Sequence, residues 1–106
     1  MDELIENFEG VDAPCSDFSG KNLQGINFNN ANLQNADFRE ANLQGATFRN
    51  ANLRRAHFQN ADLQDADFYA ANLQWTSFKN ANLKGTKFYG VVPKDIPTGN
   101  LTFYNY

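Results

Sequence analysis

One histidine and one cysteine are the side chains best able to do acid–base, metal or nucleophilic chemistry in this sequence. His57 lies twenty residues after Asp37 and forty after Asp17, so a chain that repeats every twenty residues would stack them. An imidazole beside carboxylates could bind a metal ion or sense pH, but a zinc site needs three or four converging ligands. Cys15 has no evident neighbouring base to activate it. We therefore interpret these residues as surface decoration.

Catalysis has little other support in the sequence. With one histidine and no spacing that suggests a catalytic triad, a nucleophile and its base are hard to assign. We expect no catalytic residues, no metal and no cofactor, so the chain is not expected to be an enzyme.

A second group of residues has the composition of a protein-binding site. Arg54, Arg55 and Trp75 share one face if the chain repeats every twenty residues, and Lys94 comes next in that column if the register persists. An exposed tryptophan beside arginines is typical of interaction hot spots. We predict that these four residues form a protein-binding patch. The alternative is that they are ordinary surface residues.

Another exposed column contains an arginine and two tyrosines. Arg49, Tyr69 and Tyr89 are spaced twenty residues apart, so they would lie one above the other. Stacking of the guanidinium on a tyrosine ring would explain this column in purely structural terms.

A period of five residues determines the elements that hold these side chains. Leu or Phe stands at every fifth place from Phe18 to Phe88, and the two alternate. We call this residue the centre of a unit. Ala stands two places before the centre in ten of the twelve units from Ala31 to Thr86, and Asn or Asp stands directly before it in eleven of fifteen. A period of five fits neither a helix nor a plain strand, and many short repeats indicate a stacked solenoid.

Within each unit, two positions are predicted to face inward. The centre and the residue two places before it have the same strand parity, so both side chains can point to one side. The residue before the centre and the two after it then face solvent. Asn, Asp and Gly are common in these outer places and suit tight turns.

Units such as ANLQG, ADFRE and ANLKG resemble the A(D/N)LXX motif of the pentapeptide-repeat family, over fifteen units that cover residues 16–90. The resemblance implies an all-β fold, namely a right-handed quadrilateral parallel β-helix with twenty residues in each coil. Four to five coils are expected from this length. Equivalent centres then stack, Leu on Leu and Phe on Phe. The two phenylalanine columns are Phe28, Phe48, Phe68 and Phe88, and opposite them Phe18, Phe38, Phe58 and Phe78.

We expect residues 1–106 to form a single domain, with irregular or capping ends at 1–15 and 91–106. At the N-terminal end, counting back makes Phe8 and Ala13 centres. The alternative is a short amphipathic helix with Met1, Leu4, Ile5 and Phe8 on one face.

At the C-terminal end, the same register gives three more centres, each with a larger inward partner. They are Pro93, Thr98 and Phe103, with Val91, Ile96 and Leu101. The alternative is that Pro93 and Pro97 mark a cap that leaves the coil, since an open end would expose an unpaired strand edge.

The last residues contain a group of aromatic side chains. Phe103, Tyr104 and Tyr106 stand close together in the run LTFYNY. They would either cover the last coil or serve as a self-association end. The resemblance favours considering the second role, because some members of the family dimerise through their C-terminal ends.

Composition and charge limit the function further. No apolar run is long enough to cross a bilayer, so we expect a soluble, cytoplasmic protein that does not bind membranes. The net charge is −3, but residues 1–15 carry five acids and no base, whereas residues 16–90 carry eight bases and six acids. The bases are scattered and form no stripe, so we expect no nucleic-acid binding.

Two functions follow from these observations. The first is a non-catalytic module whose rigid rod surface binds an unidentified partner protein. The second comes from a branch of the resembled family whose members imitate DNA and bind type II topoisomerases. The weakly basic repeat region and the short length count against mimicry, because DNA is densely negative. Proteins that resemble this one are abundant in cyanobacteria, often with no assigned role.

Overall fold

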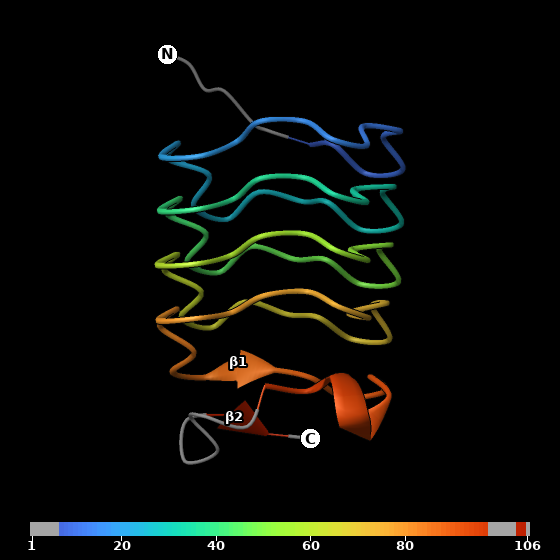
Figure 1. Cartoon of the computed structure of the whole chain (residues 1–106), viewed down its shortest axis with the longest axis vertical. Coiled ribbons are helices and arrows are strands. Elements are labelled where there is room, and N and C mark those ends of the chain that lie inside the picture. Colours follow the sequence, from blue (N-terminus) through green and yellow to red (C-terminus); the bar gives the residue numbers. More distant parts are fainter. Residues whose placement is uncertain (1–6, 98–103, 106) are drawn as a thin grey trace.

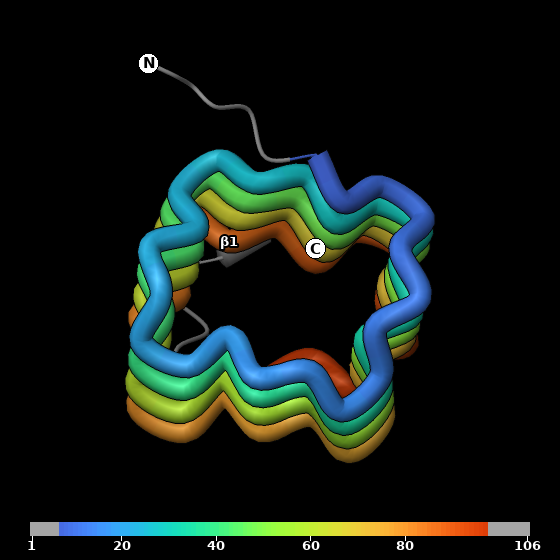
Figure 2. Tube along the Cα trace, turned by 90° about the horizontal axis from the view of Figure 1, so that it is seen from above, coloured from blue at the N-terminus to red at the C-terminus, as the bar shows by residue number. Residues whose placement is uncertain are grey.

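The computed structural model describes residues 7–97 and 104–105. The chain winds in stacked coils along the long axis of a molecule that measures 38 × 22 × 20 Å (Figure 1). Seen from above, the coils superpose in a four-sided outline (Figure 2). Thirteen isolated parallel bridges join successive coils, and each joins residues twenty apart, from Asn7 with Asn27 to Asp67 with Lys87. The chain is therefore a parallel β-helix with the repeat length that the sequence predicts.

Each unit repeats the same backbone hydrogen bonds, as the unit centred on Phe38 shows. The Phe38 N–H donates to the His57 carbonyl in the next coil at 2.7 Å, and the Asp37 N–H donates to the Ser16 carbonyl in the previous coil at 2.9 Å. The Ala41 N–H donates to the Phe38 carbonyl at 3.1 Å and closes the turn between units. Because neighbouring coils supply most of these partners, a coil is stable only within a stack.

The chain turns at the second residue after each centre, which we call the corner residue. All seventeen corner residues from Gly10 to Gly90 have a positive φ. Gly, Asn and Asp adopt this left-handed conformation more readily than other residues, which explains their frequency there. Five corner residues are of other types: Cys15, Glu40, Arg55, Ala70 and Trp75.

The strands are shorter than an all-β description suggests. Among the described residues, the continuous strands are β1 (Thr86–Lys87) and β2 (Tyr104–Asn105), which pair in parallel. Elsewhere a single residue of each unit forms a bridge, because a corner at every fifth residue interrupts the extended backbone.

The core consists of the two predicted phenylalanine columns together with leucine and alanine. Phe38 and Phe58 are fully buried and stack with ring centroids 4.9 Å apart and planes 3° from parallel. Phe48 and Phe68 stack at the same distance in the other column. The columns meet edge to face, as Phe58 and Phe68 do at 5.7 Å and 88°, which is a favourable arrangement of aromatic rings.

Two threonines replace alanine at the inward position before the centre, and both hydroxyls have a partner. Thr86 is fully buried, and its Oγ1 donates to the Leu63 carbonyl at 2.8 Å. Thr76 Oγ1 donates in the same way to the Leu53 carbonyl at 2.7 Å. These bonds offset the cost of placing a hydroxyl against the core.

At the N-terminal end, the coil register is present from the first described residue. Asn7 forms a bridge with Asn27, and the rings of Phe8 and Phe28 stack at 5.5 Å. Phe8 therefore lies in the coil rather than in the alternative helix. Met1, Leu4 and Ile5 of that proposed helix lie outside the described residues.

At the C-terminal end, the expectation that the register continues through Pro93 is wrong. Val91 and Ile96 are buried as expected, but Pro93 is exposed and begins the 3-10 helix η1 (Pro93–Asp95). Proline lacks the N–H that a centre donates to the next coil, and it suits the first turn of a helix. The Ile96 N–H instead donates to the Pro93 carbonyl at 3.2 Å.

The chain then returns to the stack in a shifted register. Thr86 pairs with Tyr104 and Lys87 with Asn105, so these partners are eighteen residues apart instead of twenty. Thr98, Leu101 and Phe103, which the sequence placed in the coil, lie outside the described residues.

Candidate protein-binding surface

The structure brings Arg54, Arg55 and Trp75 together. The guanidinium carbons of Arg54 and Arg55 lie 4.7 and 4.8 Å from the centre of the Trp75 ring. Trp75 nevertheless remains 60% exposed. Arg54 Nε also donates to Gln74 Oε1 at 3.2 Å, which fixes the arginine over the next coil. We call Arg54, Arg55 and Trp75 the Trp75 patch.

The backbone of the patch is unusual for the residues it carries. Arg55 and Trp75 are stacked corner residues with φ of 63° and 61°. A residue with a Cβ pays roughly 1–2 kcal/mol for the left-handed conformation. Asn occupies the equivalent place in the coil above, at Asn35. The large side chains therefore do not serve the turn itself.

The two patch arginines also differ from others in their pairing. Arg39 pairs with Asp37 at 2.6 Å, and Arg49 pairs with Asp67 at 2.8 Å. Neither arginine of the Trp75 patch forms an ion pair with a carboxylate of residues 7–97. The patch thus presents two positive charges and an aromatic ring whose contacts leave most of its surface open.

Lys94, predicted to extend the patch, lies in η1 and is exposed. It lines a shallow groove of about 380 Å³ together with Gln74, the residue that Arg54 contacts. Lys94 therefore lies in η1 and not in a continued coil, and it shares the groove with the neighbour of Arg54.

This groove, which we call the corner groove, was not predicted from the sequence. Small residues Ala70, Ala71 and Gly90 line it, and Val92, which is 54% exposed, lies on its C-terminal side. The rest of the lining is polar and consists of Asn72, Gln74, Lys94 and Asp95. Two of these residues, Lys94 and Asp95, belong to η1, which interrupts the coils near the C-terminal end (Figure 1). The interruption of the repeat by GVVP was the only signal of it in the sequence.

The tyrosine column runs beside the same corner. The Arg49 guanidinium lies 4.5 Å from the Tyr69 ring centre, which confirms the predicted cation–π contact. Tyr69 and Tyr89 are 41% and 45% exposed and directly precede the groove residues Ala70 and Gly90. The exposed tyrosines therefore adjoin two groove residues in the chain.

A further column stacks Asp17, Asp37 and His57 in successive coils. It contains ionic contacts but no cluster of metal ligands. The pKa of Asp37 is lowered to about 2, chiefly because Arg39 donates to its carboxylate. The pKa of Asp17 is also lowered, because the Ser19 hydroxyl and N–H donate to it. His57 is exposed beside them. Among the described residues, no three His, Cys, Asp or Glu side chains come close enough to hold a metal ion.

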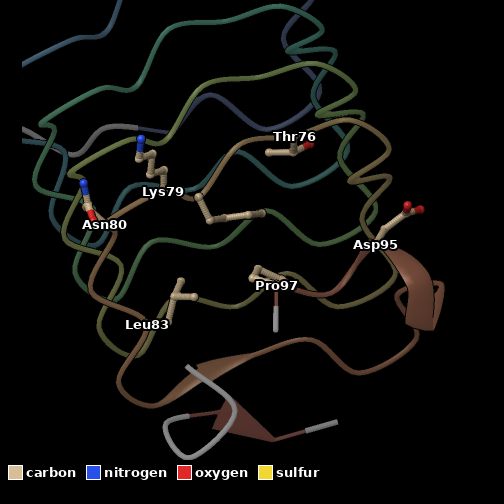
Figure 3. Close-up of a pocket in the computed structure, with 7 residues that line it drawn as sticks. Thr76, Lys79, Asn80, Leu83, Asp95 and Pro97 are labelled. Carbon is tan, nitrogen blue, oxygen red and sulfur yellow. The ribbon is translucent and has the colours of Figure 1, made fainter. Parts of the chain in front are cut away.

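A second hollow of about 430 Å³ lies at the C-terminal end of the core (Figure 3). Phe78 and Leu83 supply apolar lining, and Lys79 and Asp95 lie on opposite sides of it. Pro97, the last residue described before the gap at 98–103, also lines it.

The predicted self-association end falls mostly outside the described residues. Phe103 and Tyr106 are among those not described, and Tyr104 is placed only by its backbone pairing in β2. Self-association through these residues stays a prediction. Within the described part of the chain, no helix is long and apolar enough to span a membrane.

Comparison with known proteins identifies the repeat. A family model described as a pentapeptide repeat region matches residues 4–68 and 38–98. A search of curated proteins found no match.

Several solved structures are similar to this chain. A pentapeptide repeat protein from the thylakoid lumen of Arabidopsis thaliana is 38% identical with a TM-score of 0.75, over 79% of this chain and 62% of that one. A pentapeptide repeat protein from Nostoc PCC 7120 is 37% identical with a TM-score of 0.64, over 79% and 65%. HetL, involved in the regulation of heterocyst differentiation in Nostoc, is 30% identical with a TM-score of 0.66, over 84% and 45%. This chain spans less than two thirds of the length of each.

Proposed function

Because this chain belongs to the pentapeptide-repeat family, we propose that it is a non-catalytic module that presents a rigid rod surface to a partner protein through the Trp75 patch. The closely packed phenylalanine columns make the rod stiff. The outer side chains are thereby held on a fixed lattice, which lowers the entropy cost of binding.

The observation that carries this proposal is the exposure of Trp75 at a left-handed corner. The ring is 60% exposed while both arginines lie against it. Tryptophan and arginine are enriched in binding hot spots, where truncating one of them costs much of the binding energy. A residue that strains the backbone and covers no core is better explained by recognition than by folding.

The sharpest test replaces Trp75 by the residue type that corners prefer. We expect Trp75→Asn and Arg55→Asn to lose capture of the partner from a cell extract, with thermal unfolding nearly unchanged because Asn tolerates the left-handed backbone. Glu40→Asn is the matched control, since Glu40 is an exposed corner residue with φ of 62°. Unchanged capture by Trp75→Asn would contradict the proposal.

The handedness of the solenoid, the number of its coils, its domain organisation and its cellular location are further proposals. We propose that the solenoid is right-handed with four to five coils and that residues 1–106 form one domain with capping ends. A cytoplasmic location also stays a prediction, and the similar Arabidopsis protein comes from the thylakoid lumen.

The DNA-mimic alternative has weaker physical support. Residues 7–97 carry nine Lys or Arg and nine Asp or Glu residues, so the described surface lacks the dense negative charge of DNA. We expect no dose-dependent effect on supercoiling by DNA gyrase. Inhibition or protection of gyrase in a supercoiling assay would favour mimicry over the binding module.

A further inference from the structure

We propose that the corner groove and the Trp75 patch together form one docking site for an acidic, apolar segment of a partner protein. This inference rests on the proposed binding function and adds the location and chemistry of the ligand. It begins from the distribution of exposed apolar side chains. All four large hydrophobic side chains that are exposed in the described structure lie within one stretch of the chain: Tyr69, Trp75, Tyr89 and Val92.

The patch and the groove are physically continuous. Gln74 accepts a hydrogen bond from Arg54 and also lines the groove. Val92 and Lys94 lie on the groove in the next stretch of chain. Since neighbouring coils are separated by about 4.8 Å, the distance from the arginines to Val92 suits a few residues of extended peptide.

The shape of the groove suits apolar side chains. Small residues, namely Ala70, Ala71 and Gly90, line it at the corner. Val92 supplies an exposed apolar wall. Burial of this wall by a ligand side chain would provide hydrophobic binding energy.

The positively charged side chains around the site favour a negatively charged ligand. Arg54, Arg55 and Lys94 surround the site, and Asp95 is the one carboxylate that lines the groove among the described residues. Because the two arginines have no ion pair with a described carboxylate, ligand carboxylates would find free guanidinium donors. A basic segment would be repelled from the same site.

A random dodecapeptide phage library, selected on the intact protein and depleted on Trp75→Asn, tests this ligand chemistry. We expect the selected sequences to combine Asp or Glu with Leu, Ile, Phe or Trp. No selected peptide, or peptides without enriched acidic residues, would overturn the proposal.

The affinity of a selected synthetic peptide, measured by fluorescence anisotropy, locates the site. We expect Trp75→Asn to weaken binding about thirtyfold, and Arg54→Gln with Arg55→Asn to weaken it about tenfold. Val92→Ser should weaken it about tenfold through lost apolar contact. Lys79→Gln with Lys84→Gln removes the same charge from other exposed places and should leave binding within about twofold. If this control weakened peptide binding as much as the arginine variant does, the location of the site would be wrong.

These measurements separate the docking site from the binding function itself. A partner captured through Trp75 but unaffected by Val92→Ser would overturn the groove assignment and leave the binding function standing. Capture retained by Trp75→Asn would overturn the binding function. Concentration-dependent dimerisation that Trp75→Asn abolishes would assign the groove to a second copy of the chain and overturn a foreign partner.

Discussion

The coils before Tyr69 and those from Tyr69 onward bury their inward residues alike but differ in the apolar side chains that they expose. In the middle, the core residues from Ile26 to Leu73 are at most 5% exposed, and the outer places are almost entirely polar. At the end, where η1 interrupts the repeat, Tyr89 and Val92 are about half exposed, at 45% and 54%. With Tyr69 and Trp75, these are all the large hydrophobic side chains that are exposed in the described part of the chain, so the surface on which a partner can bury apolar area is confined to the last coils.

The arginines show the same contrast. Arg39 and Arg49 in the earlier coils form ion pairs within the protein, so their charges are already satisfied. Arg54 and Arg55 lie against Trp75 instead. The difference teaches that arginines in equivalent places of neighbouring units, such as Arg49 and Arg54, pair with a carboxylate in one unit and with an aromatic ring and an amide in the next.

The largest expected effect compares core phenylalanines in the two regions. Phe58 is fully buried and stacks on Phe38 and Phe78 at 4.9 and 5.1 Å. We expect Phe58→Ala to lower the free energy of unfolding by about 3–5 kcal/mol. Phe78 is only partly buried at the end of its column, so Phe78→Ala should cost about half as much. Urea denaturation measures both, and equal losses would show that the end is packed as tightly as the middle.

A smaller effect is expected at glycine corners. An added Cβ at Gly45 meets no atom within 4 Å, whereas at Gly85 it would clash with Asp65 Oδ1. Both glycines have a positive φ, so Gly45→Ala should cost roughly 1 kcal/mol. Gly85→Ala should cost more, because the Asp65 side chain must also move. Thermal unfolding of the two variants checks the order, and equal costs would mean that Asp65 moves freely.

The smallest effect is expected from the ion pair between Asp37 and Arg39. The lowered pKa of Asp37 means that its ionised form stabilises the folded state above pH 3.8, and this contribution is lost as the pH falls to about 2. Asp37→Asn should therefore weaken the dependence of stability on pH in that window. The change should be below about 1 kcal/mol, because Arg39 is largely exposed. Denaturation at pH 5 and near pH 2 measures it, and an unchanged dependence would show that the pair contributes nothing.

Much of this structure follows from the sequence. The inward places, the two phenylalanine columns and the Arg49–Tyr69 contact were all predicted from a period of five residues and a coil of twenty. The Arg54, Arg55 and Trp75 cluster was predicted from the same spacing. Such predictions succeed because every unit contacts only its neighbours, so one local pattern is applied repeatedly.

The sequence by itself therefore determined the lattice: which residues are buried, which stack and which face solvent. The tertiary structure alone decided how the repeat ends, with an exposed Pro93, a β2 register of eighteen residues and a groove beside Trp75. Beyond Gly90 the chain no longer repeats a local preference. Its path there depends on a proline without an N–H, on long-range pairing with β1 and on the burial of Val91 and Ile96.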